Sequence, residues 1–159
     1  MDRPWFPMFV DLSKKRALIA GGGRIAARRT RTLSIFCGSV TVVAPEIRPE
    51  IEAMEGVICQ KRPFRAEDLE GVDLVVAATD DAALNAEIAR LCRERGVPVN
   101  AASDQTLCDF YFPGVAVRGD VAIGVTASGR DHRLAAEWTR RVRQLLEDMP
   151  GDDRIGNRE

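Results

Sequence analysis

Residues 17–29 read ALIAGGGRIAARR, an apolar run that passes through three glycines directly into a run of helix-forming residues. This order predicts a strand, a tight turn and a helix. Gly21, Gly23 and Ala26 occupy the small-residue positions of G-x-G-x-x-G/A, the pattern of dinucleotide-binding turns. In such turns the second glycine lets a diphosphate approach the backbone, and the N–H groups that begin the helix face the anion. An ordinary glycine-rich turn between a strand and a packed helix is the alternative interpretation.

Apolar runs and helical patterns alternate along the first two thirds of the chain, with short links between them. This alternation predicts an α/β fold, a Rossmann-like parallel sheet with helices on both faces. The expected strands are 8–12, 16–20, 40–43, 57–61, 72–78 and 97–100, and the expected helices are 24–37, 45–54, 65–70 and 81–95. Because ligands of such sheets bind beyond the carboxyl ends of the strands, we expect four loops to converge on one crevice. These loops contain residues 21–23, 44–46, 78–81 and 100–104.

The pattern changes after residue 100. Residues 110–117 and 121–126 read as two strands joined by the turn Arg118-Gly119-Asp120, and residues 133–149 read as an amphipathic helix. This hairpin and helix are too small to bury their own aromatic residues, so we expect them to pack against a second copy of the chain in a homodimer. The expected domains are a dinucleotide-binding Rossmann domain at 1–104, a dimerisation and substrate region at 105–149, and a disordered tail at 150–159.

The composition is that of a globular protein, with 159 residues, 45% hydrophobic residues, 30% charged residues and a formal net charge of −1. This charge argues against a nucleic-acid partner, and the lack of an apolar run of about 18 residues argues against a membrane span. The four cysteines are widely spaced, which favours free thiols in a reducing cytoplasm over disulfides or a zinc site. Because His132 is the only histidine, we expect no metal site built mainly from imidazoles within one chain.

Four segments of the chain carry a resemblance to a known family. They read FPMFVDLSKKRALIAGGGRIAARR from Phe6, VTVVAPE from Val40, DLVVAATDDAALN from Asp73 and VPVNAASDQTLCDFYFPGVAVRGDVAIGVTASG from Val97. In this order and at this spacing they resemble the precorrin-2 dehydrogenase and sirohydrochlorin ferrochelatase family, the dehydrogenase part of siroheme synthase. The resemblance covers about residues 6–143. Its most specific part is residues 107–113 followed by Arg-Gly-Asp, which a generic Rossmann domain has no reason to contain.

The resemblance implies NAD-dependent oxidation of precorrin-2, a polycarboxylate tetrapyrrole, to sirohydrochlorin by a homodimer, with metal insertion in some members. It implies coenzyme contacts at Gly21, Gly22, Gly23, Arg24, Ile25, Pro45, Glu46, Thr79 and Asp80. It also implies substrate contacts at Ser103, Arg118, Ser128 and Arg130, where arginine side chains suit carboxylates. The resemblance favours NAD, whereas Arg24 beside the glycines would also tolerate the 2′-phosphate of NADP.

Two segments depart from the family pattern. The family's aspartate, three residues after the equivalent of Asn100, is Ser103 here, and Asp104 follows it. Asp104 either replaces that carboxylate in proton removal or is a turn residue that bonds its own backbone. Near the last helix, Asp131 and His132 stand where the family has Ser-Pro. Asp131 either caps the helix or forms, with His132, a replacement for lost proton-transfer or metal-binding groups.

Three functions stay open on these residues. The first is an NAD-dependent precorrin-2 dehydrogenase in which Asp104 assists proton loss. The second is a catalytically degenerate module that binds the tetrapyrrole and NAD, or a homologue that acts as a chelatase only. The third is an NAD-linked regulatory domain of a larger assembly, which predicts nucleotide binding without affinity for a polycarboxylate macrocycle.

Overall fold

The computed structural model of the protein describes residues 4–149, which fall into two compact units. The larger unit is Met8–Tyr111, and the described part of the smaller unit consists of residues 4–7 and 112–149. The structure groups residues 105–111 with the larger unit, while the functional division predicted at residue 104 stays a prediction. The predicted tail, residues 150–159, lies outside the described residues.

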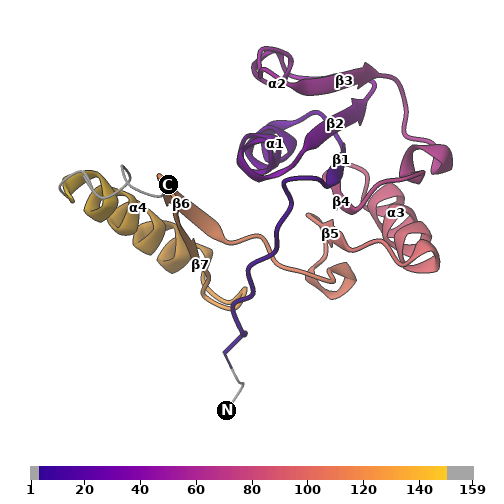
Figure 1. Cartoon of the computed structure of the whole chain (residues 1–159). Coiled ribbons are helices and arrows are strands. Elements are labelled where there is room, and N and C mark those ends of the chain that lie inside the picture. The colour runs from indigo at the N-terminus through magenta and orange to yellow at the C-terminus, as the bar shows by residue number, and fades with distance from the viewer. Residues whose placement is uncertain (1–3, 150–159) are drawn as a thin grey trace. The chain divides into compact units, whose positions relative to one another are not determined.

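The larger unit contains a five-stranded parallel sheet with helices on both faces (Figure 1). Its strands lie in the order β3-β2-β1-β4-β5, so the chain adds strands on one side of β1 and then on the other. The order in which the chain adds strands reverses between β1 and β4, although the two strands are parallel. Open α/β sheets bind their ligands at such a reversal point. These features confirm the Rossmann-like fold. The elements are β1 (Arg16–Ala20), α1 (Arg24–Phe36), β2 (Ser39–Ala44), α2 (Pro49–Glu52), β3 (Val57–Lys61), the 3-10 helix η1 (Ala66–Leu69), β4 (Leu74–Ala77), α3 (Ala82–Arg95), β5 (Val99–Ala101) and the 3-10 helix η2 (Gln105–Leu107).

Helices cover both faces of this sheet. Because successive side chains of a strand point to opposite faces, each central strand contributes apolar residues to both layers. On one face, Leu18 of β1 and Val75 of β4 belong to a buried cluster with Ile88 of α3. On the other face, α1 packs against β1 and β2 through buried residues that include Ala26 and Leu33. Figure 1 shows α1 and α3 on opposite sides of the sheet. The central strands therefore read as continuous apolar runs rather than as alternating patterns.

The smaller unit confirms the predicted hairpin and final helix, but the first strand of the hairpin begins at Gly114, and residues 110–113, predicted to belong to it, form no strand. β6 (Gly114–Arg118) and β7 (Val121–Val125) pair antiparallel, and α4 (His132–Asp148) packs against them. The backbone of β6 lies close to α4, since a Cβ at Gly114 would lie 1.9 Å from the Thr139 hydroxyl oxygen of α4. None of the helices within residues 4–149 has the length and apolar character that a membrane span requires.

The edge strand predicted at residues 8–12 is wrong, because the structure assigns no strand there. The carbonyl oxygen of Leu12 instead accepts hydrogen bonds from the N–H groups of Lys15 and Gly38, at 2.9 and 3.1 Å. These bonds form the turn that leads into β1. They use the backbone acceptor that pairing with a neighbouring strand would need.

The helix predicted at residues 45–54 is wrong in its extent, since α2 spans only Pro49–Glu52. Proline begins this helix as expected for the first helical position, but the proline is Pro49 and not Pro45. The residues between them form a loop, and the N–H of Arg48 donates to the carbonyl oxygen of Gly22 at 3.1 Å. This loop therefore packs on the glycine turn.

Candidate functional site

The glycine turn between β1 and α1 is enclosed by the backbone of two neighbouring loops. Gly21 has a φ of 122°, a conformation that favours glycine. A Cβ at Gly21 would lie 2.2 Å from the carbonyl oxygen of Ala78, and a Cβ at Gly22 would lie 2.0 Å from that of Glu46. The loops after β4 and β2 thus hold the turn in place. Neither glycine accepts a side chain unless the backbone of these loops moves.

Gly23, by contrast, faces open space. No atom lies within 4 Å of a Cβ built at Gly23, and the residue is exposed. Gly23 is the N-cap of α1 and supplies no capping side chain, and the first turn of α1 contains no acidic residue. The other long helices, α3 and α4, are capped by the carboxylates of Asp81 and Asp131. The first N–H groups of α1 therefore face the exterior, and the helix dipole favours an anion such as a diphosphate there.

The loop after β2 places Pro45 and Glu46 beside the glycine turn, and both residues are exposed. β2 ends at Ala44, so no carboxylate stands at the strand end, where NAD-binding domains carry the acid that binds the ribose hydroxyls. The nearest acid is Glu46, two residues further on. The structure brings the predicted coenzyme contacts at residues 21–25 and 45–46 together at the carboxyl end of the sheet.

Two aspartates follow Thr79 on the loop after β4, and they have different surroundings. The carboxylate of Asp81 accepts hydrogen bonds from the N–H groups of Ala83 and Leu84, at 2.9 and 3.1 Å, and so begins α3. The carboxylate of Asp80 is exposed and makes no hydrogen bond or ion pair within residues 4–149. Asp80 is therefore the member of the pair that is open to a ligand.

A buried asparagine, which the sequence analysis did not single out, joins two loops at this end of the sheet. Asn85 of α3 is 0% exposed. Its Oδ1 accepts hydrogen bonds from the N–H and hydroxyl of Thr79 at 3.1 and 2.8 Å. Its Nδ2 donates to the carbonyl oxygen of Thr79 at 3.1 Å and to Oγ of Ser103 at 3.2 Å. The signal in the sequence is positional, because Asn85 shares the buried face of α3 with apolar residues and a buried amide needs partners.

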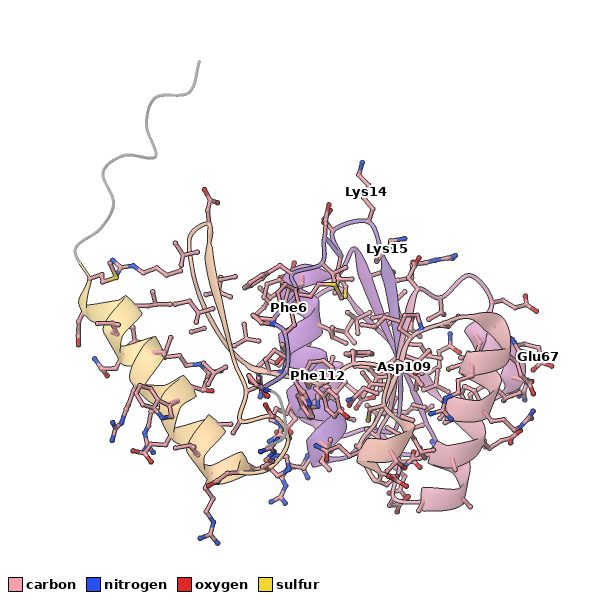
Figure 2. All side chains as sticks on the ribbon, turned by 90° about the horizontal axis from the view of Figure 1, so that it is seen from below. Phe6, Lys14, Lys15, Glu67, Asp109 and Phe112 are labelled. Atoms are coloured by element: carbon pink, nitrogen blue, oxygen red, sulfur yellow. The ribbon has the colours of Figure 1, made fainter. Side chains whose placement is uncertain are left out.

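The loop after β5 is closed by hydrogen bonds between its two ends. Asp109, labelled in Figure 2, accepts a hydrogen bond from the N–H of Val99 at 3.0 Å. The N–H of Asp109 donates to the carbonyl oxygen of Val99 at 2.8 Å. Asn100, which is 5% exposed, donates to the carbonyl oxygen of Phe110 at 2.9 Å. These bonds attach residues 105–111 to the sheet and leave Ser103 exposed on the loop.

Asp104, the predicted catalytic residue, begins the 3-10 helix η2. Its Oδ1 accepts hydrogen bonds from the N–H and hydroxyl of Thr106, at 2.8 and 2.7 Å. These hydrogen bonds lower the pKa of the Asp104 carboxyl group below its ordinary value of 3.8. A lower pKa makes the carboxylate a weaker base at neutral pH. The contacts match the interpretation as a turn residue, and the catalytic role stays a prediction.

Three predicted substrate residues belong to the smaller unit. The guanidinium of Arg118 donates to carbonyl oxygens at the C-terminal end of α4, including that of Met149 at 2.5 Å. Ser128 has a φ of 53°, and its hydroxyl oxygen accepts a hydrogen bond from the N–H of Trp5 at 3.4 Å. Arg130 lies in the same turn and is exposed. Arg118 therefore has a structural role in holding α4, and the substrate contacts of all three residues stay predictions.

The altered segment before α4 forms a helix cap. The carboxylate of Asp131 accepts a hydrogen bond from the N–H of Leu134 at 2.8 Å. His132 is the first residue of α4 and is exposed. Within the described part of the chain, no group of three or more His, Cys, Asp or Glu side chains is arranged to hold a metal ion. Asp131 thus acts as the capping residue that one of the two interpretations expected.

Known proteins share both the sequence and the fold of this chain. A family model described as "Putative NAD(P)-binding" matches residues 8–114. Precorrin-2 dehydrogenase from Bacillus subtilis (strain 168) is 35% identical over 144 residues, which cover 89% of this chain and 88% of that protein. Siroheme synthase from Ectopseudomonas mendocina (strain ymp) is 39% identical over 127 residues, 79% of this chain and 27% of that protein. The solved structure of SirC, precorrin-2 dehydrogenase, has a TM-score of 0.68 and 28% identity, covering 90% of this chain and 70% of that chain.

The relatives differ in how much of their length this chain accounts for. The chain spans about a quarter of the siroheme synthases from Ectopseudomonas mendocina (strain ymp) and Pseudomonas fluorescens (strain Pf0-1), at 27% and 28% of their lengths. It spans 88% of the Bacillus protein. The shared region includes the glycine turn and the loops after β2, β4 and β5, all of which lie within residues 8–114.

Proposed function

The chain belongs to the precorrin-2 dehydrogenase family, and from that premise we propose that it oxidises precorrin-2 to sirohydrochlorin with NAD as coenzyme. The reaction removes a hydride and a proton from the macrocycle, and the coenzyme supplies the hydride acceptor. The observation that carries the proposal is the glycine turn. Gly23 leaves an open approach to the uncapped start of α1, and the N–H groups there suit a diphosphate.

We assign the coenzyme to residues 21–25, 45–46 and 79–80, which surround this approach. NAD is proposed over NADP because the exposed carboxylate of Glu46 follows β2 and would repel a 2′-phosphate. The arginine of the same loop, Arg48, is engaged in an ion pair with Glu50 at 3.1 Å. Arg24 at the start of α1 is the cation that would favour NADP instead. Calorimetric titration with each nucleotide decides, and tighter binding of NAD is the expected result.

The substrate is a polycarboxylate, so its recognition requires hydrogen-bond donors and cations. We propose that Ser103 of the larger unit donates a hydrogen bond to one of its carboxylates. Asp104 is proposed to accept the proton that leaves the macrocycle, because its carboxylate is ionised and exposed. We assign no substrate contact to Arg118, because its guanidinium donates to carbonyl oxygens at the end of α4.

A binding module without dehydrogenase activity is the second candidate. One observation favours it: the carboxylate of Asp104 is engaged by Thr106, and Ser103 occupies the position where the resemblance places an aspartate. Such a protein binds NAD and the tetrapyrrole but transfers no hydride. The assay below separates it from the enzyme.

We further propose that the protein is a cytoplasmic homodimer. α4 carries an exposed apolar stripe of Leu134, Trp138 and Leu145, with 44%, 50% and 62% of each residue exposed. Burial of this stripe against a second copy would remove apolar surface from water. The thiol groups of the cysteines are free, as in a reducing compartment, and burial raises the pKa of Cys37 and Cys92 to about 11.

The test is an anaerobic assay of the native chain with precorrin-2 and NAD. The expected result is formation of NADH and sirohydrochlorin in equal amounts, followed by absorbance. Parallel reactions with ferrous or cobalt ion show whether metal insertion follows. A folded chain that binds NAD and the tetrapyrrole but forms no NADH would support the binding module instead.

A further inference from the structure

The side-chain amide of Asn85 has a single permitted orientation, because the backbone of Thr79 determines it. The N–H of Thr79 can only donate, and it meets Oδ1 at 3.1 Å. The carbonyl of Thr79 can only accept, and it meets Nδ2 at 3.1 Å. The second N–H of Nδ2 is then directed at Oγ of Ser103, 3.2 Å away. The hydroxyl oxygen of Ser103 is therefore the acceptor in this contact, and its hydrogen is left for another partner.

The side-chain amide of Asn85 has all its hydrogen-bond partners within the chain, whereas the hydroxyl of Ser103 can still donate. Oδ1 of Asn85 has two donors and Nδ2 has two acceptors, and the residue is 0% exposed. A buried network of this kind holds one geometry, because each broken bond would leave a polar group unpaired. Ser103 is exposed, and within residues 4–149 its hydroxyl makes no hydrogen bond besides the one from Asn85.

We propose that Asn85 is a positioning residue of the substrate site, which fixes the Ser103 hydroxyl as a hydrogen-bond donor to a carboxylate of the substrate. The inference rests on the proposed function, since a polycarboxylate substrate supplies the acceptor. Asn85 also ties the loop after β5 to Thr79, one of the predicted coenzyme contacts. A neutral donor at residue 103 attracts a substrate carboxylate that an aspartate there would repel.

The test compares Asn85→Asp, Ser103→Ala and the double variant with the native chain. Ionised aspartate keeps the acceptor for the Thr79 N–H, loses Nδ2, and takes the hydrogen of Ser103 for itself. For each single variant we expect the KM for precorrin-2 and the Kd for sirohydrochlorin to rise about tenfold, as for one lost hydrogen bond to a charged group. For Ser103→Ala, which leaves the contacts between Asn85 and Thr79 in place, the Kd for NAD is expected to stay within about twofold, a change below half a kcal/mol. The double variant is expected to bind no more weakly than the weaker single variant, because both changes remove the same donor.

A pH series gives a second readout that a merely structural role would not change. Burial raises the pKa of a carboxyl group placed at residue 85. Below that pKa the protonated carboxyl of Asn85→Asp can donate to Ser103 again, so substrate affinity returns toward the native value. Above that pKa the affinity falls. The affinity ratio of the variant to the native chain therefore drops as pH rises.

Controls separate this inference from the proposed function. Ser34→Ala removes a hydroxyl that bonds within α1, to the carbonyl of Thr30, and should keep native KM and Kd values. A native chain that oxidises precorrin-2 while the variants keep the native KM would overturn the inference alone, as would additive effects in the double variant. A native chain that neither binds nor oxidises precorrin-2 would overturn both. If Asn85→Asp does not fold, Ser103→Thr replaces it in the test. Ser103→Thr keeps a hydroxyl and should retain the substrate affinity that Ser103→Ala loses. An equal loss of affinity in Ser103→Thr and Ser103→Ala would overturn the inference.

Discussion

Substitutions at Gly21 and Gly23 test separately the stability of the glycine turn and its binding of the coenzyme. Gly21→Ala places a methyl 2.2 Å from the Ala78 carbonyl at a φ of 122°. We expect it to lower the free energy of unfolding by about 3 kcal/mol or more. Gly23→Ala places a methyl in open space, so its stability should stay within about 0.5 kcal/mol of the native value. Its NAD affinity should fall about tenfold to a hundredfold, because the methyl obstructs the diphosphate. Urea unfolding and calorimetric titration measure the two effects, and unchanged NAD affinity for Gly23→Ala would contradict the assignment.

Asp104 also has a role that a single substitution can test. Asp104→Asn keeps an acceptor for Thr106 but removes the charge, so kcat is expected to fall about a hundredfold if the carboxylate takes up the proton. The hydrogen bonds from Thr106 hold the pKa of Asp104 below 3.8. The group is therefore ionised throughout pH 5–8, and its contribution is lost only as pH falls through the lowered pKa. The native kcat should show no decline from Asp104 in that range. A kcat equal to the native value for Asp104→Asn would reduce this residue to a helix cap.

At the scale of elements, the start of α3 places two adjacent carboxylates in different roles. Asp81→Ala removes the cap that holds the N–H groups of Ala83 and Leu84, so the free energy of unfolding should fall by about 1 kcal/mol. Asp80→Ala should leave stability unchanged and weaken NAD binding, because the exposed carboxylate of Asp80 makes no contact within the described residues. Thermal unfolding and NAD titration of both variants form a matched pair. A loss of stability for Asp80→Ala together with a loss of NAD affinity for Asp81→Ala would contradict this assignment of roles.

The elements also show what the sequence reveals and what it hides. The parallel sheet was predictable because its strands are short buried apolar runs bounded by glycine, proline or charged residues. The start of α2 was not, because either proline suits the first helical position and the choice depends on the contact between Arg48 and Gly22. Asn85 was missed because its partner Ser103 lies 18 residues further along the chain. Local patterns predict elements, whereas contacts between loops require the fold.

At the scale of the whole molecule, the exposed stripe on α4 predicts how copies of the chain associate. Thr139 and Leu146 are the buried residues of α4, whereas Trp138 on the adjacent stripe is 50% exposed. Trp138→Glu should therefore preserve folding but place a charge in the proposed interface, which shifts the chain from dimer to monomer in light scattering. Arg140→Glu changes a charge on another face of α4 and should remain dimeric. A native chain that is monomeric at micromolar concentration would contradict the proposed homodimer.

The proposed activity requires a coenzyme diphosphate held by the start of α1 at the glycine turn. A crystal structure of the chain with NAD tests this most directly. We predict the diphosphate against the N–H groups of residues 23–25, with no side chain between it and Gly23. A crystal saturated with NAD whose glycine turn stays empty, or whose coenzyme binds elsewhere, would contradict the account.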